Sequence, residues 1–215
     1  MAGQVRVGDA IVRKIGTQVP LDQPIALIAG PKYVSRGGEK LEGALDDFQL
    51  SPEGRVCIDV GASTGGFTDC LLQRGAAQVI AVDVGKGQLD ISLRNDPRVI
   101  SLEETHILHL GADRFGSRPT FGVIDASFIS LKNILAHVKS LMAEGGTLLA
   151  MVKPQFEVGP KLLKKGVVRT EEARVAAVED VIQFAKQQGF HYLSQAPAKI
   201  KGPKGNQEYF IHLKT

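Results

Sequence analysis

The chain has 215 residues, of which 43% are hydrophobic and 23% charged, so it can bury one sizeable core and carry a small appendage. Its formal net charge of +3 permits a polyanionic partner without requiring one. The two cysteines form neither a disulfide framework nor a zinc spacing, and no apolar run is long enough to cross a membrane. We therefore expect a cytoplasmic protein without a bound metal.

The first 31 residues differ in pattern from the rest of the chain. They consist of short β-branched runs broken by Gly and Pro, without a helical period. We expect a small β segment over residues 1–31, followed by one main domain over residues 32–215. At the start of that domain, apolar residues recur at helical spacing after Gly38 and predict a helix that ends before Ser51.

Strands and helices then alternate along the chain. We predict seven strands at Val56–Val60, Gln78–Val84, Arg98–Leu102, Phe121–Ile124, Thr147–Val152, Phe190–Ile200 and Tyr209–Leu213. Helices are predicted between them at Phe67–Gly75, Leu131–Met142 and Glu171–Gln188. Apolar strands that alternate with helices predict an α/β fold, with a mostly parallel sheet covered on both faces.

A glycine-rich turn, DVGASTGG, follows the first of these strands and opens a helix. In that context glycines let the backbone approach a ligand, and amide N–H groups point at it. Asp83 ends the next strand, where a carboxylate can accept both ribose hydroxyls of a nucleoside. A tight turn and a surface acid would explain either feature alone, but together they favour a nucleoside site. Its candidate residues are Asp59, Gly61, Ser63, Gly65, Gly66 and Asp83.

The turn also indicates which nucleoside binds. Dinucleotide sites usually show G-x-G-x-x-G, whereas this turn reads D-x-G-x-x-x-G-G. The acid at Asp59 would repel a pyrophosphate, but it can hold, directly or through water, the ammonium of a methionine moiety. The pattern favours S-adenosylmethionine over NAD.

Four further polar residues are predicted to converge: Lys40, Asp125, Lys153 and Glu208. Asp125 and Lys153 each follow an apolar strand, at the edge where open α/β sheets bind ligands. If the last strand runs antiparallel beside the strand that precedes Lys153, Glu208 begins at the same edge. A structural ion-pair network would explain any one of these residues, but four of them around a cofactor turn favour catalysis.

The chemistry that suits this cluster is methyl transfer to a ribose hydroxyl, which is a poor nucleophile and needs activation. A partly desolvated lysine near a second lysine and a sulfonium has its neutral form favoured, so it can act as a general base. We expect Lys153 to be this base and Lys40 its cationic neighbour. Asp125 and Glu208 would orient the lysines and the hydroxyl.

Several segments resemble, in order and spacing, the TlyA or hemolysin A family within the FtsJ-like RNA 2′-O-methyltransferases. They are YVSRGGEKLEGAL, DVGASTGGFTD, VDVGKGQLDISLRNDPRV, DASFISL, MVKPQFEVG, KGVVR and GNQEYFIHL. The resemblance implies a Rossmann-like class I methyltransferase fold with an antiparallel last strand, S-adenosylmethionine as cofactor, and cytidine 2′-hydroxyls of rRNA or ribosomal subunits as substrate. It places the family's Lys-Asp-Lys-Glu tetrad on the four converging residues, and Glu103 is a candidate for the adenine side.

The resemblance also implies that residues 1–31 are the last strands of an S-four type RNA-binding domain. In the main domain, basic residues occupy two loops predicted to lie beside the catalytic edge, where phosphate contacts would position RNA. They are Lys161, Lys164, Lys165, Arg169, Lys199, Lys201 and Lys204. Ordinary solvated loops are the alternative interpretation.

Two other functions stay open from the sequence. One is the cytolytic activity behind the family's name, which would need an amphipathic or membrane-spanning segment, and none is evident. The other is binding of the cofactor or of RNA without catalysis.

Overall fold

The computed structural model describes residues 5–14, 16–28 and 30–215, and the chain divides into two compact units, 1–32 and 33–215. The first unit holds a three-stranded antiparallel sheet of order β2-β1-β3. Its strands are β1 (Val5–Val7), β2 (Ala10–Val12) and β3 (Ile25–Leu27). The assignment of this unit to an S-four type domain stays a prediction.

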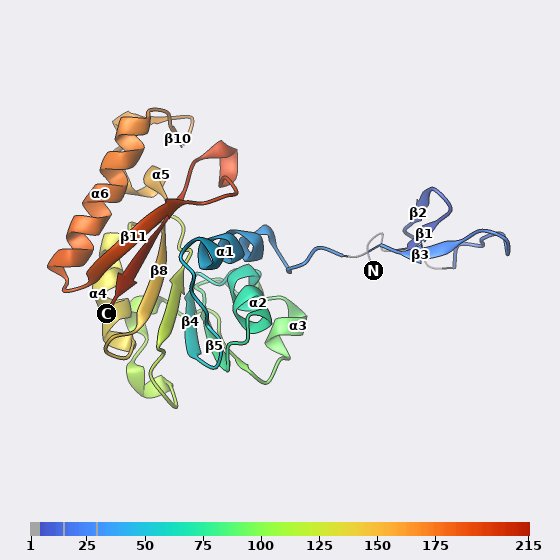
Figure 1. The fold of residues 1–215 in the computed structure, drawn as a ribbon, viewed down its shortest axis with the longest axis horizontal. Helices are drawn as coiled ribbons and strands as arrows, with labels where there is room; N and C mark the ends of the chain where they lie inside the picture. The colour runs from blue at the N-terminus through green and yellow to red at the C-terminus, as the bar shows by residue number, and fades with distance from the viewer. Residues whose placement is uncertain (1–4, 15, 29) are drawn as a thin grey trace. The chain divides into compact units, whose positions relative to one another are not determined.

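The second unit is built on a seven-stranded sheet of order β11-β12-β8-β7-β4-β5-β6 (Figure 1). Its strands are β4 (Val56–Val60), β5 (Gln78–Val82), β6 (Val99–Leu102), β7 (Phe121–Ile124), β8 (Thr147–Val152), β11 (His191–Pro197) and β12 (Tyr209–Lys214). Its α-helices are α1 (Arg36–Asp47), α2 (Gly66–Gln73), α3 (Ile91–Arg94), α4 (Leu135–Leu141), α5 (Pro154–Glu157) and α6 (Glu171–Gln187). Short elements complete it: η1 (Ile107–His109), η2 (Ala112–Arg114), η3 (Leu131–Asn133), η4 (Pro160–Leu162), η5 (Pro203–Gly205), β9 (Leu163–Lys164) and β10 (Val167–Val168).

The sheet has the predicted topology. Strands β4 to β8 pair in parallel, whereas β12 is antiparallel to both β8 and β11. Tyr209 at the start of β12 lies opposite Val152 at the end of β8. The beginning of β12 therefore meets the carboxyl ends of the parallel strands, and the expected class I methyltransferase arrangement is confirmed.

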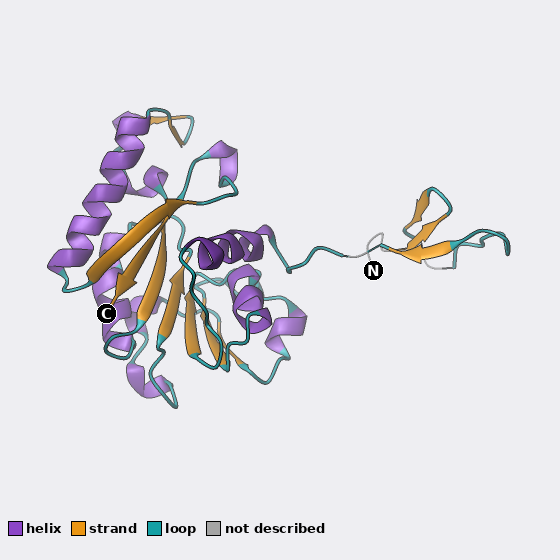
Figure 2. Cartoon of the chain, in the orientation of Figure 1, coloured by secondary structure: helices purple, strands orange, loops and turns teal. Residues whose placement is uncertain are grey.

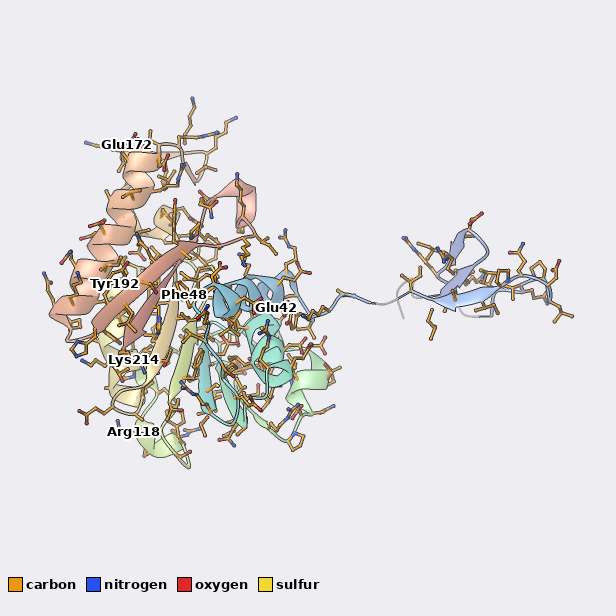
Figure 3. All side chains as sticks on the ribbon, viewed as in Figure 1. Glu42, Phe48, Arg118, Glu172, Tyr192 and Lys214 are labelled. Atoms are coloured by element: carbon orange, nitrogen blue, oxygen red, sulfur yellow. The ribbon has the colours of Figure 1, made fainter. Side chains whose placement is uncertain are left out.

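Helices cover both faces of the sheet (Figure 2), because alternate strand residues point to opposite sides. Within β4, Cys57 packs with α1 and α2, whereas its neighbour Ile58 packs with α4 and α6. Side chains fill both layers between helices and sheet (Figure 3). The resulting rigid core holds the strand ends in fixed positions.

Some predicted elements differ from the structure. The helix predicted at Leu131–Met142 is interrupted at Ile134, whose φ of −120° is not helical, so η3 and α4 form instead. The strand predicted at Gln78–Val84 ends at Val82, and the Asp83 carboxylate accepts from the amides of Ser63 and Gly85. Across residues 5–14, 16–28 and 30–215, no helix is long and apolar enough to cross a membrane.

Candidate active site

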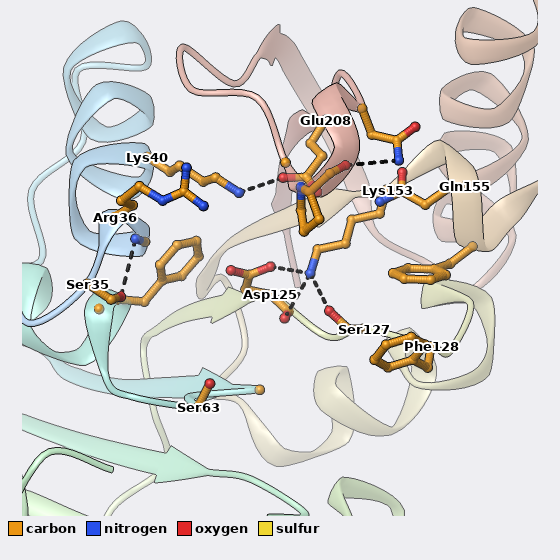
Figure 4. Close-up of a pocket in the computed structure, with 18 of the residues that line it drawn as sticks. Ser35, Arg36, Lys40, Ser63, Asp125, Ser127, Phe128, Lys153, Gln155 and Glu208 are labelled. Carbon is orange, nitrogen blue, oxygen red and sulfur yellow. Dashed lines mark hydrogen bonds and ion pairs between the residues drawn. The ribbon is translucent and has the colours of Figure 1, made fainter. Parts of the chain in front are cut away.

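The four predicted catalytic residues lie together at the carboxyl edge of the sheet and form two ion pairs (Figure 4). Lys40 Nζ lies 2.6 Å from Glu208 Oε2, and Lys153 Nζ lies 2.6 Å from Asp125 Oδ1. The sequence predicts the cluster but not which lysine pairs with which acid. Their catalytic roles stay a proposal.

Both ion pairs are largely removed from solvent. The Glu208 side chain is fully buried, and that of Lys153 is 9% exposed. Burial raises the pKa of Asp125, and the nearby Lys153 ammonium opposes that shift. Among the residues that the structure describes, Glu208 Oε1 has no hydrogen-bond partner, so this buried oxygen can accept a donor from a ligand.

Helix α1 carries Lys40 to the edge of the sheet because it packs closely on the start of α2. Ser35 caps α1, and its Oγ accepts from the Gly37 amide. A Cβ built on Gly66 would lie 2.2 Å from Ser35 Oγ, so only glycine allows this approach. The glycine-rich turn thus places α1 over the site as well as shaping a ligand cavity.

The rest of the turn is arranged around Asp83. Asp83 Oδ2 accepts from the Ser63 amide at 2.8 Å and Oδ1 accepts from the Gly85 amide at 2.7 Å, which leaves each oxygen able to accept once more. Gly61 has a φ of +85°, and a Cβ there would lie 2.9 Å from the carbonyl oxygen of Asp125. Gly65, with a φ of +95°, is the N-cap residue that precedes α2.

Two cavities open at this edge of the sheet. One, of about 550 Å³, lies over β4, β5 and β7 and is lined by Val82, Asp83, Gln88, Thr105, His106 and Ile107, among others. The other, of about 620 Å³, is lined by Arg36, Lys40, Lys153, Gln155, Lys204 and Glu208, among others. Both volumes fall in the range of small-molecule sites. The residues common to both cavities are Gly61, Ser63, Asp125, Ser127 and Phe128.

Asp59 lies behind this surface. It is fully buried in the middle of the sheet, and its Oδ2 accepts from Thr68 Oγ1 at 2.7 Å. Its Oδ1 has no hydrogen-bond partner among the described residues. Burial raises the pKa of Asp59 to about 7, against the lowering effect of the Thr68 hydroxyl. Its contact with a methionine ammonium stays a prediction.

This raised pKa has a measurable consequence for stability. A carboxyl that ionises near pH 4 when unfolded but near pH 7 when folded reduces the free energy of unfolding as pH rises across that interval. Asp59→Asn keeps an acceptor for Thr68 but does not ionise. We expect the free energy of unfolding of the variant, taken relative to that of wild type, to rise by roughly 3 kcal/mol between pH 4 and pH 8. Urea unfolding at the two pH values measures this difference. An equal difference at both pH values would contradict the raised pKa.

Glu103, the candidate for the adenine side, is engaged elsewhere. Its Oε1 accepts from the amides of Gln88 and Leu89 at 2.6 and 3.1 Å, and its Oε2 lies 3.3 Å from Arg94 Nη2. These amide bonds lower the pKa of Glu103. The carboxylate therefore holds the loop beside the smaller cavity, and contact with adenine stays a prediction.

The predicted RNA-contacting residues occupy two loops at the larger cavity. Lys204 lines that cavity directly, whereas Lys199 pairs with Asp47 at 2.7 Å. The side chains of the other five predicted residues are exposed: Lys161, Lys164, Lys165, Arg169 and Lys201. Asn206 joins the two loops, because its Nδ2 donates to the Gly166 carbonyl at 3.0 Å.

The structure also identifies site residues that the sequence interpretation missed. Arg36 lies one turn before Lys40 on α1 and lines the same cavity, so helical spacing from Lys40 could have indicated it. Phe128 is 91% exposed, has a φ of +64°, and its ring lies 5.2 Å from that of Phe156. An exposed aromatic in a strained conformation at the cavity junction suits stacking with a base. Ser127 is the third missed residue.

Comparisons with known proteins identify a methyltransferase family and fold. The model of the FtsJ-like methyltransferase family matches residues 33–215. The 16S/23S rRNA (cytidine-2′-O)-methyltransferase TlyA of Mycobacterium tuberculosis is 42% identical over 217 residues, covering 100% of this chain and 81% of TlyA. A solved hemolysin candidate from Streptococcus thermophilus has a TM-score of 0.85 at 40% identity, covering 99% of this chain and 79% of that one. An S-adenosylmethionine-dependent methyltransferase candidate from Listeria monocytogenes, 15% identical, shares the fold with a TM-score of 0.60 over 84% and 99% of the two chains.

Proposed function

The chain belongs to the FtsJ-like methyltransferase family, and from this premise we propose that it transfers a methyl group from S-adenosylmethionine to a ribose 2′-hydroxyl of rRNA. The observation that carries the proposal is the position of the two ion pairs in the larger cavity, with Asp125 at its junction with the smaller one. One cavity suits a nucleoside cofactor, and the other suits a nucleotide presented by RNA. The relative TlyA acts on cytidine in 16S and 23S rRNA, and we extend this target class to the present chain.

The smaller cavity fits the cofactor's nucleoside. The two remaining acceptor positions of the Asp83 carboxylate match the two hydroxyls of a ribose, and the amides that fix this carboxylate set its orientation. The unpartnered oxygen of Asp59, which lies behind the cavity surface, suits an ammonium reached through water. When bound, S-adenosylmethionine supplies an electrophilic methyl group on a sulfonium.

The catalytic residues act on the hydroxyl that receives the methyl. Lys153 lies in the larger cavity beside Asp125, which lines both cavities, and it removes the hydroxyl proton as the oxygen attacks, while Asp125 holds the amine in place. Lys40, fixed by the buried Glu208, contributes a second positive charge to the same cavity. Phe128 offers a ring against which the target base can stack.

The direct test uses the purified chain, labelled S-adenosylmethionine and unmodified ribosomes, separated subunits and free rRNA. We expect label in rRNA, at a nucleotide that becomes resistant to alkaline cleavage because its 2′-oxygen is methylated. Cofactor binding by calorimetry without transfer to any of these substrates would favour the non-catalytic alternative. Lysis of erythrocytes by detergent-free protein that survives Lys153→Ala would favour the cytolytic one.

The basic loops give this function a salt dependence. Each lost phosphate contact reduces the slope of log affinity against log salt by about one. We expect the double variant Lys161→Ala/Lys164→Ala to bind ribosomal particles more weakly. The slope should become shallower by one to two, at about 0.7–0.9 per lost contact, with little change in kcat at saturating substrate. The control Lys186→Ala removes an exposed charge from the end of α6. An unchanged slope would show that the loops do not contact phosphates.

A further inference from the structure

Three oxygen atoms surround the amine of Lys153 (Figure 4). Asp125 Oδ1 lies at 2.6 Å, Ser127 Oγ at 2.8 Å and the Asp125 carbonyl oxygen at 3.3 Å from Nζ. An ammonium has three N–H donors, and it donates to Ser127 Oγ and to the Asp125 carbonyl, whereas Asp125 Oδ1 is an ion-pair contact without hydrogen-bond geometry. A neutral amine has two N–H donors and one lone pair, and that lone pair can accept a hydrogen bond from a partner that donates.

Only one of these partners is able to reverse its role. A carboxylate and a backbone carbonyl can accept hydrogen bonds but not donate them, whereas a hydroxyl can do both. The other charged groups near this amine, Lys40 and Glu208, are engaged with each other. Ser127 is therefore the contact that can satisfy Lys153 both as an ammonium, by accepting, and as an amine, by donating.

We propose that Ser127 is a further catalytic residue, which relays the proton from the ribose hydroxyl to Lys153. Ser127 lines both cavities, so its oxygen is available at the point where methyl donor and hydroxyl meet. If the Ser127 hydroxyl donates a hydrogen bond to the lone pair of the neutral lysine, the substrate proton reaches Lys153 Nζ through Ser127 Oγ. This inference rests on the proposed function, with Lys153 as the final base.

The relay balances in atoms and electrons. The ribose O–H bond breaks, and its proton forms a new bond to Ser127 Oγ. The original Ser127 proton moves to Lys153 Nζ, which becomes an ammonium beside the Asp125 carboxylate. The electron pair of the ribose oxygen forms the bond to the methyl carbon, and the pair of the broken carbon–sulfur bond stays on sulfur. Serine is regenerated within the same step.

The experiment measures transfer to ribosomal particles by Ser127→Ala, Ser127→Thr and Lys153→Ala, with pH–rate profiles and cofactor affinity for each. We expect Ser127→Ala to lower kcat about 100-fold across the pH range, because the ribose proton loses its relay to the amine. Ser127→Thr keeps the hydroxyl and should stay within about fivefold of wild type. Ser140→Ala, an exposed serine on α4, is the matched control.

The outcomes separate this inference from the proposed function. Wild-type kcat and pH profile in Ser127→Ala, with an inactive Lys153→Ala, would overturn the relay and leave Lys153 as a direct base. Full activity in Lys153→Ala would overturn the proposed mechanism itself. If Ser127→Ala unfolds, Ser127→Thr decides: a folded, cofactor-binding but inactive threonine variant would also overturn the relay.

Discussion

Lys153→Ala is expected to lower kcat for methyl transfer by about 10³-fold, while the dissociation constant for S-adenosylmethionine changes by less than about threefold. The reason is geometric: the lysine lines the larger cavity but not the nucleoside cavity. Single-turnover transfer and calorimetry on the same preparation measure the two quantities. A comparable loss of both would contradict the assigned role.

A second substitution separates charge from proton transfer. Lys153→Arg keeps a cation beside the partly buried Asp125, so the ion pair survives, but a guanidinium does not accept a proton at accessible pH. We expect it to be as inactive as the alanine variant while keeping wild-type thermal stability. Lys186→Ala, on the exposed surface of α6, should match wild type in the transfer assay. An active arginine variant would show that Lys153 acts only as a cation.

Asp83→Ala is expected to weaken S-adenosylmethionine binding by about 100-fold, because a charge-assisted hydrogen bond contributes about 1.5–3 kcal/mol. The carboxylate both presents two acceptor positions and fixes the amides of Ser63 and Gly85. At saturating cofactor, kcat should recover to within about tenfold of wild type. Calorimetry and a cofactor titration of the transfer rate measure the effect.

The control for Asp83 is Glu179→Ala, which removes an exposed acid from α6 and should leave cofactor binding unchanged. Unaltered affinity in Asp83→Ala would show that the nucleoside lies elsewhere. Loss of kcat that persists at saturating cofactor would instead place Asp83 in the chemical step.

Most of the sheet was predictable because its strands are apolar runs bounded by polar residues. β4, β7 and β8 begin and end at the predicted residues. The β9–β10 hairpin was not predicted, because its strands have two residues each and are held by a tertiary contact, the hydrogen bonds of Asn206. Phe128 was missed because its exposure and positive φ leave no periodic signal.

The sequence by itself determined the α/β order, the nucleoside-type turn, and the placement of acids and lysines after buried strands. Those features are local, since each depends on hydrophobic spacing within a few residues. Only the tertiary structure decided that Lys40 pairs with Glu208, 168 residues away, and that Lys153 has Ser127 as a hydroxyl partner. Such pairings depend on strand order and on how far each helix and loop reaches over the sheet, which local spacing does not specify.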